Sequence, residues 1–269
     1  MSKRVDLFDS TYGHFSEPVL EAIRQETFGH DIGQNSWLTV DEYDRFISWL
    51  GLEAGDRVLE VASGSGGPAL HLARRTGCQV SGIDANESGV ASANQTAIKS
   101  GQTQQASFSV GDANGPLAFE NDAFDALLCL DSMNHFPNRL AVLQEWRRVL
   151  RPGRRAVFTD PVVITGPVTN EELALRSSIG FFLFVPPGTN ERLLQEAGFQ
   201  LIRQEDVTDN IALVSGRWHA ARQRHRSALL QIEGQERFDG LQAFFAVVHQ
   251  LTAERRLSRF AYCVEKTAG

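Results

Sequence analysis

Residues 60–69 have the sequence EVASGSGGPA, which finishes a predicted strand and opens a predicted helix. The small residues let the backbone turn tightly and approach a ligand, whose anionic part would meet the positive end of the helix. Pro68 suits the first helical turn, where a missing N–H costs nothing. No Gly-Lys-Ser/Thr follows, which excludes a P-loop. Gly64, Gly66 and Ala69 match the dinucleotide pattern G-x-G-x-x-A, so a nucleotide site and a bare turn both stay open.

Outward from this loop, apolar segments alternate with helical periods through the middle of the chain. The expected strands include CQVSGIDA, ASFSVGDA, DALLCLDS and RAVFTDPVV, and the expected helices cover residues 87–100 and 139–150. Strands that alternate with helices form a parallel sheet covered on both faces, and strands without polar alternation are fully buried. The chain finishes on RFAYCVEK, which alternates like a final strand. We therefore predict an α/β fold with a doubly wound sheet.

The regions that flank this core are predicted to be mainly helical. Residues 1–50 form an expected N-terminal helical arm that packs on the core, because apolar side chains recur there at helical spacing. Residues 51–269 form the expected main domain. Cap elements are predicted at about 165–190 and 209–253, the second as long helices over 209–232 and 236–251. Arginines between 217 and 226 are expected on a solvated helix face.

The charge balance and the apolar content exclude several kinds of partner. Lys+Arg 26 and Asp+Glu 33 give a formal net charge of -7, so the overall field repels nucleic-acid phosphates and anionic lipid heads. No window approaches the ~18 apolar residues of a membrane span, and the first residues do not resemble a signal peptide. Cys78, Cys129 and Cys263 are widely separated, which predicts neither a disulfide framework nor a metal site. We expect a cytoplasmic protein, and the oligomeric state is not predicted.

An ordered set of motifs extends the pattern around the glycine loop. Glu60 precedes the loop, Asp84 ends the second strand, Gly111-Asp112-Ala113 ends the third, and LRPG separates the fourth from the fifth. Over about residues 52–161 this set resembles the class I S-adenosylmethionine-dependent methyltransferases, and RFAYCVEK matches their reversed last strand. The resemblance implies a Rossmann-like, mostly parallel sheet of seven strands with a helical cap, S-adenosylmethionine as the cofactor and a small-molecule methyl acceptor.

The resemblance also implies a cofactor site. Asp84 would accept hydrogen bonds from both ribose hydroxyls and Asp112 from the adenine amino group, with helix capping as the alternative role for both. Most members have glycine where this chain has Ala62, and a backbone with negative φ would accept the extra methyl group. The residues assigned to the cofactor are Trp37, Thr39, Glu60, Ala62, Gly64, Gly66, Asp84, Ala85, Asp112, Ala113 and Leu130.

The stretch LDSMNH, at residues 130–135, carries the candidate base. It resembles the segment after strand four in the phosphoethanolamine and sarcosine/dimethylglycine methyltransferases. The phosphoethanolamine members pair the histidine at the position of His135 with an N-terminal tyrosine, for which Tyr12 is the nearest candidate. A histidine pKa near ~6.5 suits a base at neutral pH. His135 and Tyr12 are therefore the expected catalytic residues, against the alternatives of a packing histidine and a core aromatic.

Three further predictions concern the strip over the cofactor, the wall of the substrate pocket and the atom that is methylated. Residues 33–39 resemble a strip that folds over the cofactor in this group, where Thr39 or Ser36 would bond the methionine carboxylate, or Trp37 would be only a core anchor. The stretch IGFFLFVPPG, together with Phe244 and Phe245, predicts an apolar or aromatic pocket wall, with core packing as the alternative. We expect methyl transfer to oxygen or nitrogen. An NAD(P)-dependent oxidoreductase and a non-catalytic cofactor-binding protein are the other classes considered, since fold does not fix activity.

Overall fold

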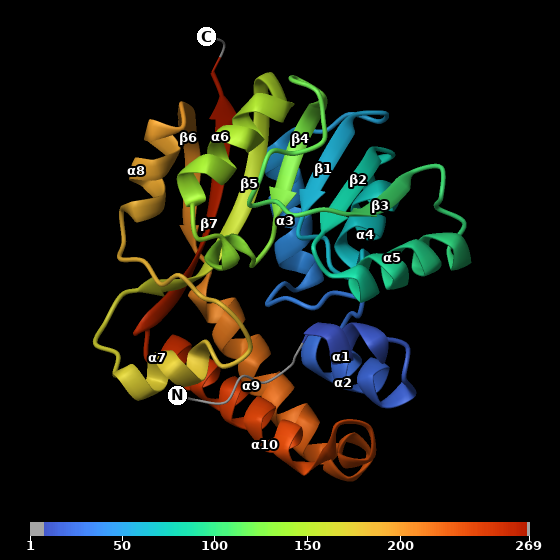
Figure 1. Cartoon of the computed structure of the whole chain (residues 1–269), viewed down its shortest axis with the longest axis vertical. Coiled ribbons are helices and arrows are strands. Elements are labelled where there is room, and N and C mark those ends of the chain that lie inside the picture. The colour runs from blue at the N-terminus through green and yellow to red at the C-terminus, as the bar shows by residue number, and fades with distance from the viewer. Residues whose placement is uncertain (1–7, 268–269) are drawn as a thin grey trace.

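The computed structural model describes residues 8–267, and these form one twisted sheet of seven strands (Figure 1). The strands are β1 (Arg57–Val61), β2 (Gln79–Asp84), β3 (Ala106–Val110), β4 (Phe124–Cys129), β5 (Leu150–Ile164), β6 (Phe199–Asp206) and β7 (Leu257–Lys266). Their order is β3-β2-β1-β4-β5-β7-β6, and β7 runs antiparallel to both β5 and β6 while the other pairs are parallel. The predicted mostly parallel sheet with a reversed last strand is confirmed.

Helices cover both faces of the sheet, which makes it doubly wound. One face carries α3 (Val40–Leu50), α4 (Gly67–Thr76) and α5 (Glu87–Lys99), and the other carries α6 (Arg139–Val149) and α8 (Thr189–Glu196). All residues of β4 are buried, which explains why its sequence shows no polar alternation. Ala126 and Leu128 pack into the first core and Leu127 and Cys129 into the second, because successive side chains of a strand point to opposite faces.

A helical layer lies across the carboxyl ends of the parallel strands (Figure 1). It contains α1 (Phe8–Gly13), α2 (Pro18–Phe28), α7 (Asn170–Arg176), α9 (Thr208–Arg224) and α10 (Arg226–Ala253). Ile23 and Phe28 of α2 share a hydrophobic cluster with Trp218 of α9 and Phe244 of α10. The first 50 residues therefore contribute to both layers, since α3 packs on the sheet and α2 on the cap. The division of the chain at residue 50 stays a prediction.

The two long cap helices break at positions other than those predicted. The helix expected to continue to Ile232 ends at Arg224, and α10 then contains a non-helical residue, Gly234, with φ 73° and ψ 170°. The prediction that the arginines between 217 and 226 lie on a solvated face was wrong for Arg222, which is buried in an ion pair with Glu233. Among residues 8–267, no helix combines the length and apolar character needed to cross a membrane.

Candidate functional site

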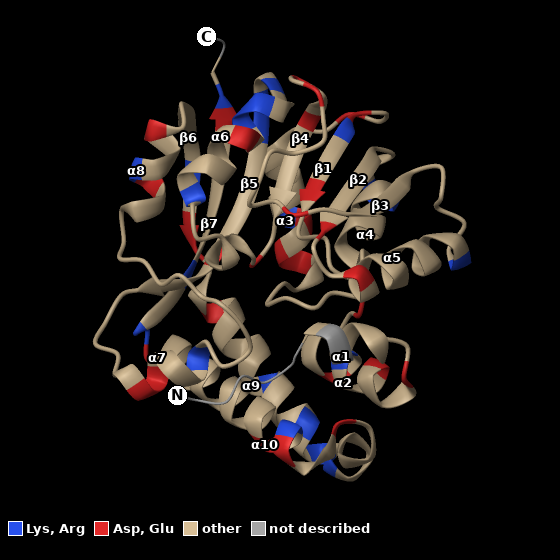
Figure 2. Cartoon of the chain, in the orientation of Figure 1, with Lys and Arg blue, Asp and Glu red and all other residues tan. Residues whose placement is uncertain are grey.

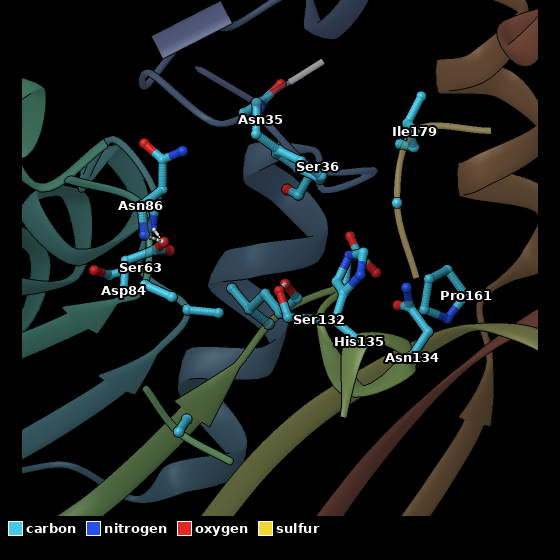
Figure 3. Close-up of a pocket in the computed structure, with 18 of the residues that line it drawn as sticks. Asn35, Ser36, Ser63, Asp84, Asn86, Ser132, Asn134, His135, Pro161 and Ile179 are labelled. Carbon is cyan, nitrogen blue, oxygen red and sulfur yellow. Dashed lines mark hydrogen bonds between the residues drawn. The ribbon is translucent and has the colours of Figure 1, made fainter. Parts of the chain in front are cut away.

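A cavity of about 740 Å³ lies where the strand ends meet the helical layer, the usual ligand position in an open α/β sheet. Its volume is typical of small-molecule sites. In Figure 3, Asp84 and Ser63 lie on one side of it, and His135, Asn134 and Ile179 on the other. Predicted site residues that line it are Tyr12, Trp37, Glu60, Ala62, Gly64, Asp84, Ala85, Asp112, Ala113, Leu130 and His135. Among the described residues, no group of three or more His, Cys, Asp or Glu is arranged to hold a metal ion.

Asp84 fixes the shape of the glycine loop. The Gly64 amide donates to its Oδ2 at 2.7 Å and the Asn86 amide donates to its Oδ1 at 2.8 Å. Burial raises the pKa of Asp84, and these two hydrogen bonds oppose that effect. Each carboxylate oxygen keeps a second lone pair that can accept from a ligand. Asp84 therefore holds the backbone of the loop and of the following turn, and it keeps a geometry suited to diol recognition.

One expectation for the loop was wrong, and one glycine assigned to the cofactor lies away from the cavity. Ala62 has φ 58°, a left-handed conformation that favours glycine, and not the negative φ that would make alanine neutral. Gly66 does not line the cavity, because it faces the neighbouring elements. A Cβ on Gly66 would lie 2.7 Å from Ala93 Cβ and from the Phe108 ring. The glycine at position 66 is thus required by the close packing of α5 and β3 on the loop.

Glu60 is a buried carboxyl beneath the loop. It is 3% exposed, and within residues 8–267 its Oε2 has no hydrogen-bond partner. Burial, assisted by the nearby charge of Asp84, raises the pKa of Glu60 to about 8. Such an oxygen is costly to leave unsatisfied, so Glu60 is suited to accept a hydrogen bond from a cationic or N–H group in the cavity.

The third strand ends in a more open part of the site. Asp112 is exposed, and its Oδ1 accepts from the backbone amide of Asn114 at 2.9 Å and from its Nδ2 at 2.8 Å. Ala113 and Leu130 are buried and supply apolar lining. A carboxylate beside an apolar slot is compatible with an aromatic base that carries an amino group.

His135 is held in one tautomer by the loop that follows α7. Its Nδ1 lies 2.9 Å from the Phe181 carbonyl oxygen, and a carbonyl only accepts, so Nδ1 carries the proton and Nε2 a lone pair. The Phe182 ring packs edge-on at 4.8 Å between centroids. Burial is the main cause that lowers the pKa of His135 below 6.5. The imidazole is therefore neutral at pH 7 and able to act as a base.

Tyr12 is not paired with His135, which corrects the predicted dyad. Its hydroxyl lies over the glycine loop, only 2.5 Å from where a Cβ on Gly64 would stand. The Phe8 ring contacts both residues, with centroids 6.4 Å from Tyr12 and 5.8 Å from His135. Burial and the charge of Asp84 raise the pKa of Tyr12 far above its usual value. Tyr12 is a neutral hydroxyl on the loop side of the cavity.

The strip at residues 33–39 bridges the two layers, with different residues at the cavity from those expected. Thr39 does not line the cavity, because its hydroxyl lies 3.3 Å from Asn210 Oδ1. Its assignment to the cofactor is not supported, whereas Ser36 does reach the cavity. The Trp37 ring belongs to an aromatic cluster of the cap, 5.9 Å from Trp218 and 6.3 Å from Phe244.

Two cavity residues were not among the predicted site residues, although Asn134 lies within the LDSMNH stretch. Asn134 is 0% exposed and Arg176 is 1% exposed, and both line the cavity. Arg176 ends a polar helical stretch, NEELALR, whose composition is that of an ordinary solvated helix. Only the packing of the cap brings its side chain inside.

Comparisons with known proteins agree with this geometry. Residues 58–153 match the family described as "Methyltransferase domain". The 27-O-demethylrifamycin SV methyltransferase of Amycolatopsis mediterranei is 31% identical over 205 residues, which cover 73% of this chain and 75% of that protein. The chain belongs to the class I S-adenosylmethionine-dependent methyltransferases. Methyltransferase GfsG of Streptomyces halstedii is 33% identical over 178 residues, or 64% of this chain and 61% of that protein.

A solved structure gives the same family fold. Phosphoethanolamine N-methyltransferase 2 of Haemonchus contortus, in complex with S-adenosyl-L-methionine, aligns with a TM-score of 0.81 at 20% identity, over 98% of this chain and 61% of that one. The methyltransferase described here uses the same cofactor. The cavity residues fit it, because the unpartnered oxygen of Glu60 and the carboxylates of Asp84 and Asp112 can accept hydrogen bonds, and the cofactor has ammonium, hydroxyl and amino groups that donate them.

Proposed function

We propose that this methyltransferase methylates a hydroxyl oxygen of a small, largely apolar molecule, with His135 as the general base. The observation that carries the proposal is the Nδ1 hydrogen bond to Phe181, which leaves Nε2 as an acceptor in the cavity that also contains the glycine loop. A hydroxyl must lose its proton during transfer, so a neutral base is useful for oxygen and less needed for an amine. The name of the rifamycin relative, an O-methylating enzyme, supports oxygen over nitrogen.

The cofactor-binding roles are part of the same proposal. Asp84 accepts from the ribose hydroxyls, Asp112 from the adenine amino group, and Glu60 with the loop backbone holds the amino-acid end. When bound, S-adenosylmethionine supplies a methyl group already activated by its sulfonium. The protein then has to align the acceptor and exclude water. The Phe8 and Phe182 rings flank His135 and would limit water at the reacting oxygen.

The proton and the methyl group move in one balanced exchange. S-adenosylmethionine, held by Asp84, Asp112 and Glu60, would supply the methyl group, and its sulfur would become a neutral thioether as the acceptor oxygen bonds to the methyl carbon. His135 Nε2 takes the hydroxyl proton, and the Phe181 carbonyl stabilises the imidazolium through Nδ1–H. Tyr12, over Gly64, would then contact the cofactor and not the acceptor.

His135→Gln tests the proposal in an assay for S-adenosylhomocysteine release, over a panel of hydroxylated aromatic and polyketide acceptors. Turnover is expected to fall by ~10²–10⁴ with unchanged affinity for S-adenosylhomocysteine. The wild-type rate should decline as pH drops through the pKa of His135, which lies below 6.5 because of burial, since protonation removes the Nε2 lone pair. The variant should lack that decline.

His30→Gln is the matched control, since His30 is exposed and does not line the cavity. It should retain turnover and the acidic limb. Near-normal turnover by a folded His135→Gln variant would overturn the role of His135. Transfer only to amines across the panel would overturn the assignment to oxygen.

A further inference from the structure

Arg176 is a buried cation at the edge of the cavity, on the side of His135 where the methyl acceptor would bind, which we call the acceptor side. It ends α7, is 1% exposed and lines the cavity. Within residues 8–267, none of its three guanidinium nitrogens, Nε, Nη1 and Nη2, has a hydrogen-bond acceptor. Buried charged groups in proteins are normally paired, so we expect this guanidinium to bind a hydrogen-bond acceptor that enters the cavity.

The surroundings of Arg176 are mostly aromatic. Its Cζ lies 4.7 Å from the ring centroid of Phe182, 5.3 Å from that of Phe244 and 5.9 Å from that of Trp37. Aromatic faces attract a cation but accept no strong hydrogen bond. Burial lowers the pKa of Arg176 to about 9, so the group is still charged at neutral pH.

The nearby carboxylates are bonded to other groups. Asp160 accepts from Arg139 Nη1 at 2.5 Å and from Asn190 Nδ2 at 2.8 Å. Asp131 accepts from Arg259 Nε at 2.6 Å and from the Thr159 hydroxyl at 2.8 Å. Both carboxylates attract the charge of Arg176 through space, but neither accepts a hydrogen bond from it.

We propose that Arg176 binds a carboxylate of the methyl acceptor, and that the acceptor is therefore a monoanionic acid with an aromatic or otherwise apolar body. This inference rests on the proposed function for the transfer itself. The planar guanidinium fork matches a carboxylate in a bidentate pair. Asn134 provides a further donor, since both polar atoms of its fully buried side chain also lack a partner in the described chain.

The charges of the cavity favour one negative charge over two. Arg176 is the only Lys or Arg among the described residues that line it, whereas the carboxylates of Asp84 and Asp112 also line it. Two further acidic residues of the lining add little charge, because Asp131 is paired with Arg259 and the pKa of Glu60, about 8, keeps that carboxyl mostly protonated at pH 7. Figure 2 shows Asp and Glu, in red, at the edge where the strands meet the cap. A phosphate dianion would face this negative field with one cation to offset it. A carboxylate anchored at Arg176 leaves another group of the same molecule free to reach His135.

The test is calorimetry with 2-naphthoate and 2-naphthamide in the presence of S-adenosylhomocysteine. Wild type is expected to bind the acid at least 10-fold more tightly than the amide. Arg176→Met should remove that preference, leave the affinity for S-adenosylhomocysteine unchanged and keep or raise the Tm, because an unpaired charge is no longer buried. Arg217→Met, at an exposed position on α9, should behave as wild type.

Several results would overturn the inference. One is an equal preference for the acid in wild type and Arg176→Met, and another is a joint loss of Tm and cofactor affinity in that variant, which indicates a structural arginine. Tighter, Arg176-dependent binding of 2-naphthyl phosphate would replace the carboxylate by a phosphate. If the acid binds through Arg176 but no hydroxyl acceptor is methylated, the proposed function fails and the anion site stands. If instead the acid shows no dependence on Arg176, while Arg176→Met efficiently methylates neutral acceptors through His135, the anion site fails and the proposed function stands.

Discussion

Alanine at position 62 has a backbone conformation that glycine adopts more easily. Its φ of 58° is in the left-handed region, where a Cβ costs roughly 1–2 kcal/mol. Glycine also gains entropy in the unfolded chain, which offsets about 0.5–1 kcal/mol. We expect Ala62→Gly to raise the free energy of unfolding by about 0.5–1 kcal/mol, measured by urea denaturation.

Ala91→Gly provides a control of opposite sign. Ala91 is an exposed residue within α5, where glycine should destabilise by about 0.5–1 kcal/mol. If both substitutions destabilise equally, the left-handed strain at position 62 is not present. The comparison isolates the backbone because neither change adds a side-chain contact.

At the scale of elements, the irregular cap helix shapes the acceptor side of the site. Gly234 interrupts α10 with φ 73° and ψ 170°, a combination that is essentially confined to glycine. A Cβ there would meet no atom within 4 Å, so any effect of Gly234→Ala comes from the backbone. We expect a loss of about 1–3 kcal/mol in the free energy of unfolding.

Gly115→Ala is the control, at a glycine in the segment between β3 and β4. A Cβ on Gly115 also meets nothing within 4 Å, and its φ lies outside the positive range. It should change stability by less than about 0.5 kcal/mol. Equal effects of the two substitutions would contradict the claim that the break in α10 requires glycine.

At the scale of the whole molecule, segments far apart in the sequence cover one sheet edge. Tyr12 of α1 lies over Gly64, and the Phe181 carbonyl holds His135. We expect S-adenosylhomocysteine to slow amide hydrogen exchange in Phe8–Gly13 and in residues 177–185, because local opening there must precede cofactor release. Amides of β4, which is buried throughout, serve as the internal reference.

The exchange experiment also tests whether α1 and residues 177–185 form a lid that opens or a fixed wall of the cavity. Slower exchange confined to the glycine loop, with no change in α1 or residues 177–185, would refute a lid. Residues 33–37 are expected to change less, since the Ser65 hydroxyl donates to the Gly33 carbonyl at 2.9 Å and the Trp37 amide donates to Asp131 at 2.9 Å.

Local sequence signals determined the sheet and the loop side of the site. The uninterrupted apolar run of β4 and the alternation of strands and helices predict a covered parallel sheet, because burial on both faces leaves no place for polar residues. Asp84 was predictable for a similar reason, since it ends a strand 20 residues after the loop glycine that it contacts. Signals of this kind depend on neighbours in sequence and on one fixed topology.

Only the tertiary structure decided which side chains face the acceptor. Thr39 turned to Asn210, 171 positions away, and Arg176 entered the cavity because α7 packs against the aromatic residues of a helix that follows it by some 50 residues. The positive φ of Ala62 is likewise a property of the folded loop. These environments are created by contacts between segments that are distant in the sequence. The type of a residue and its sequence neighbours therefore do not determine which side chains will surround it in the folded protein.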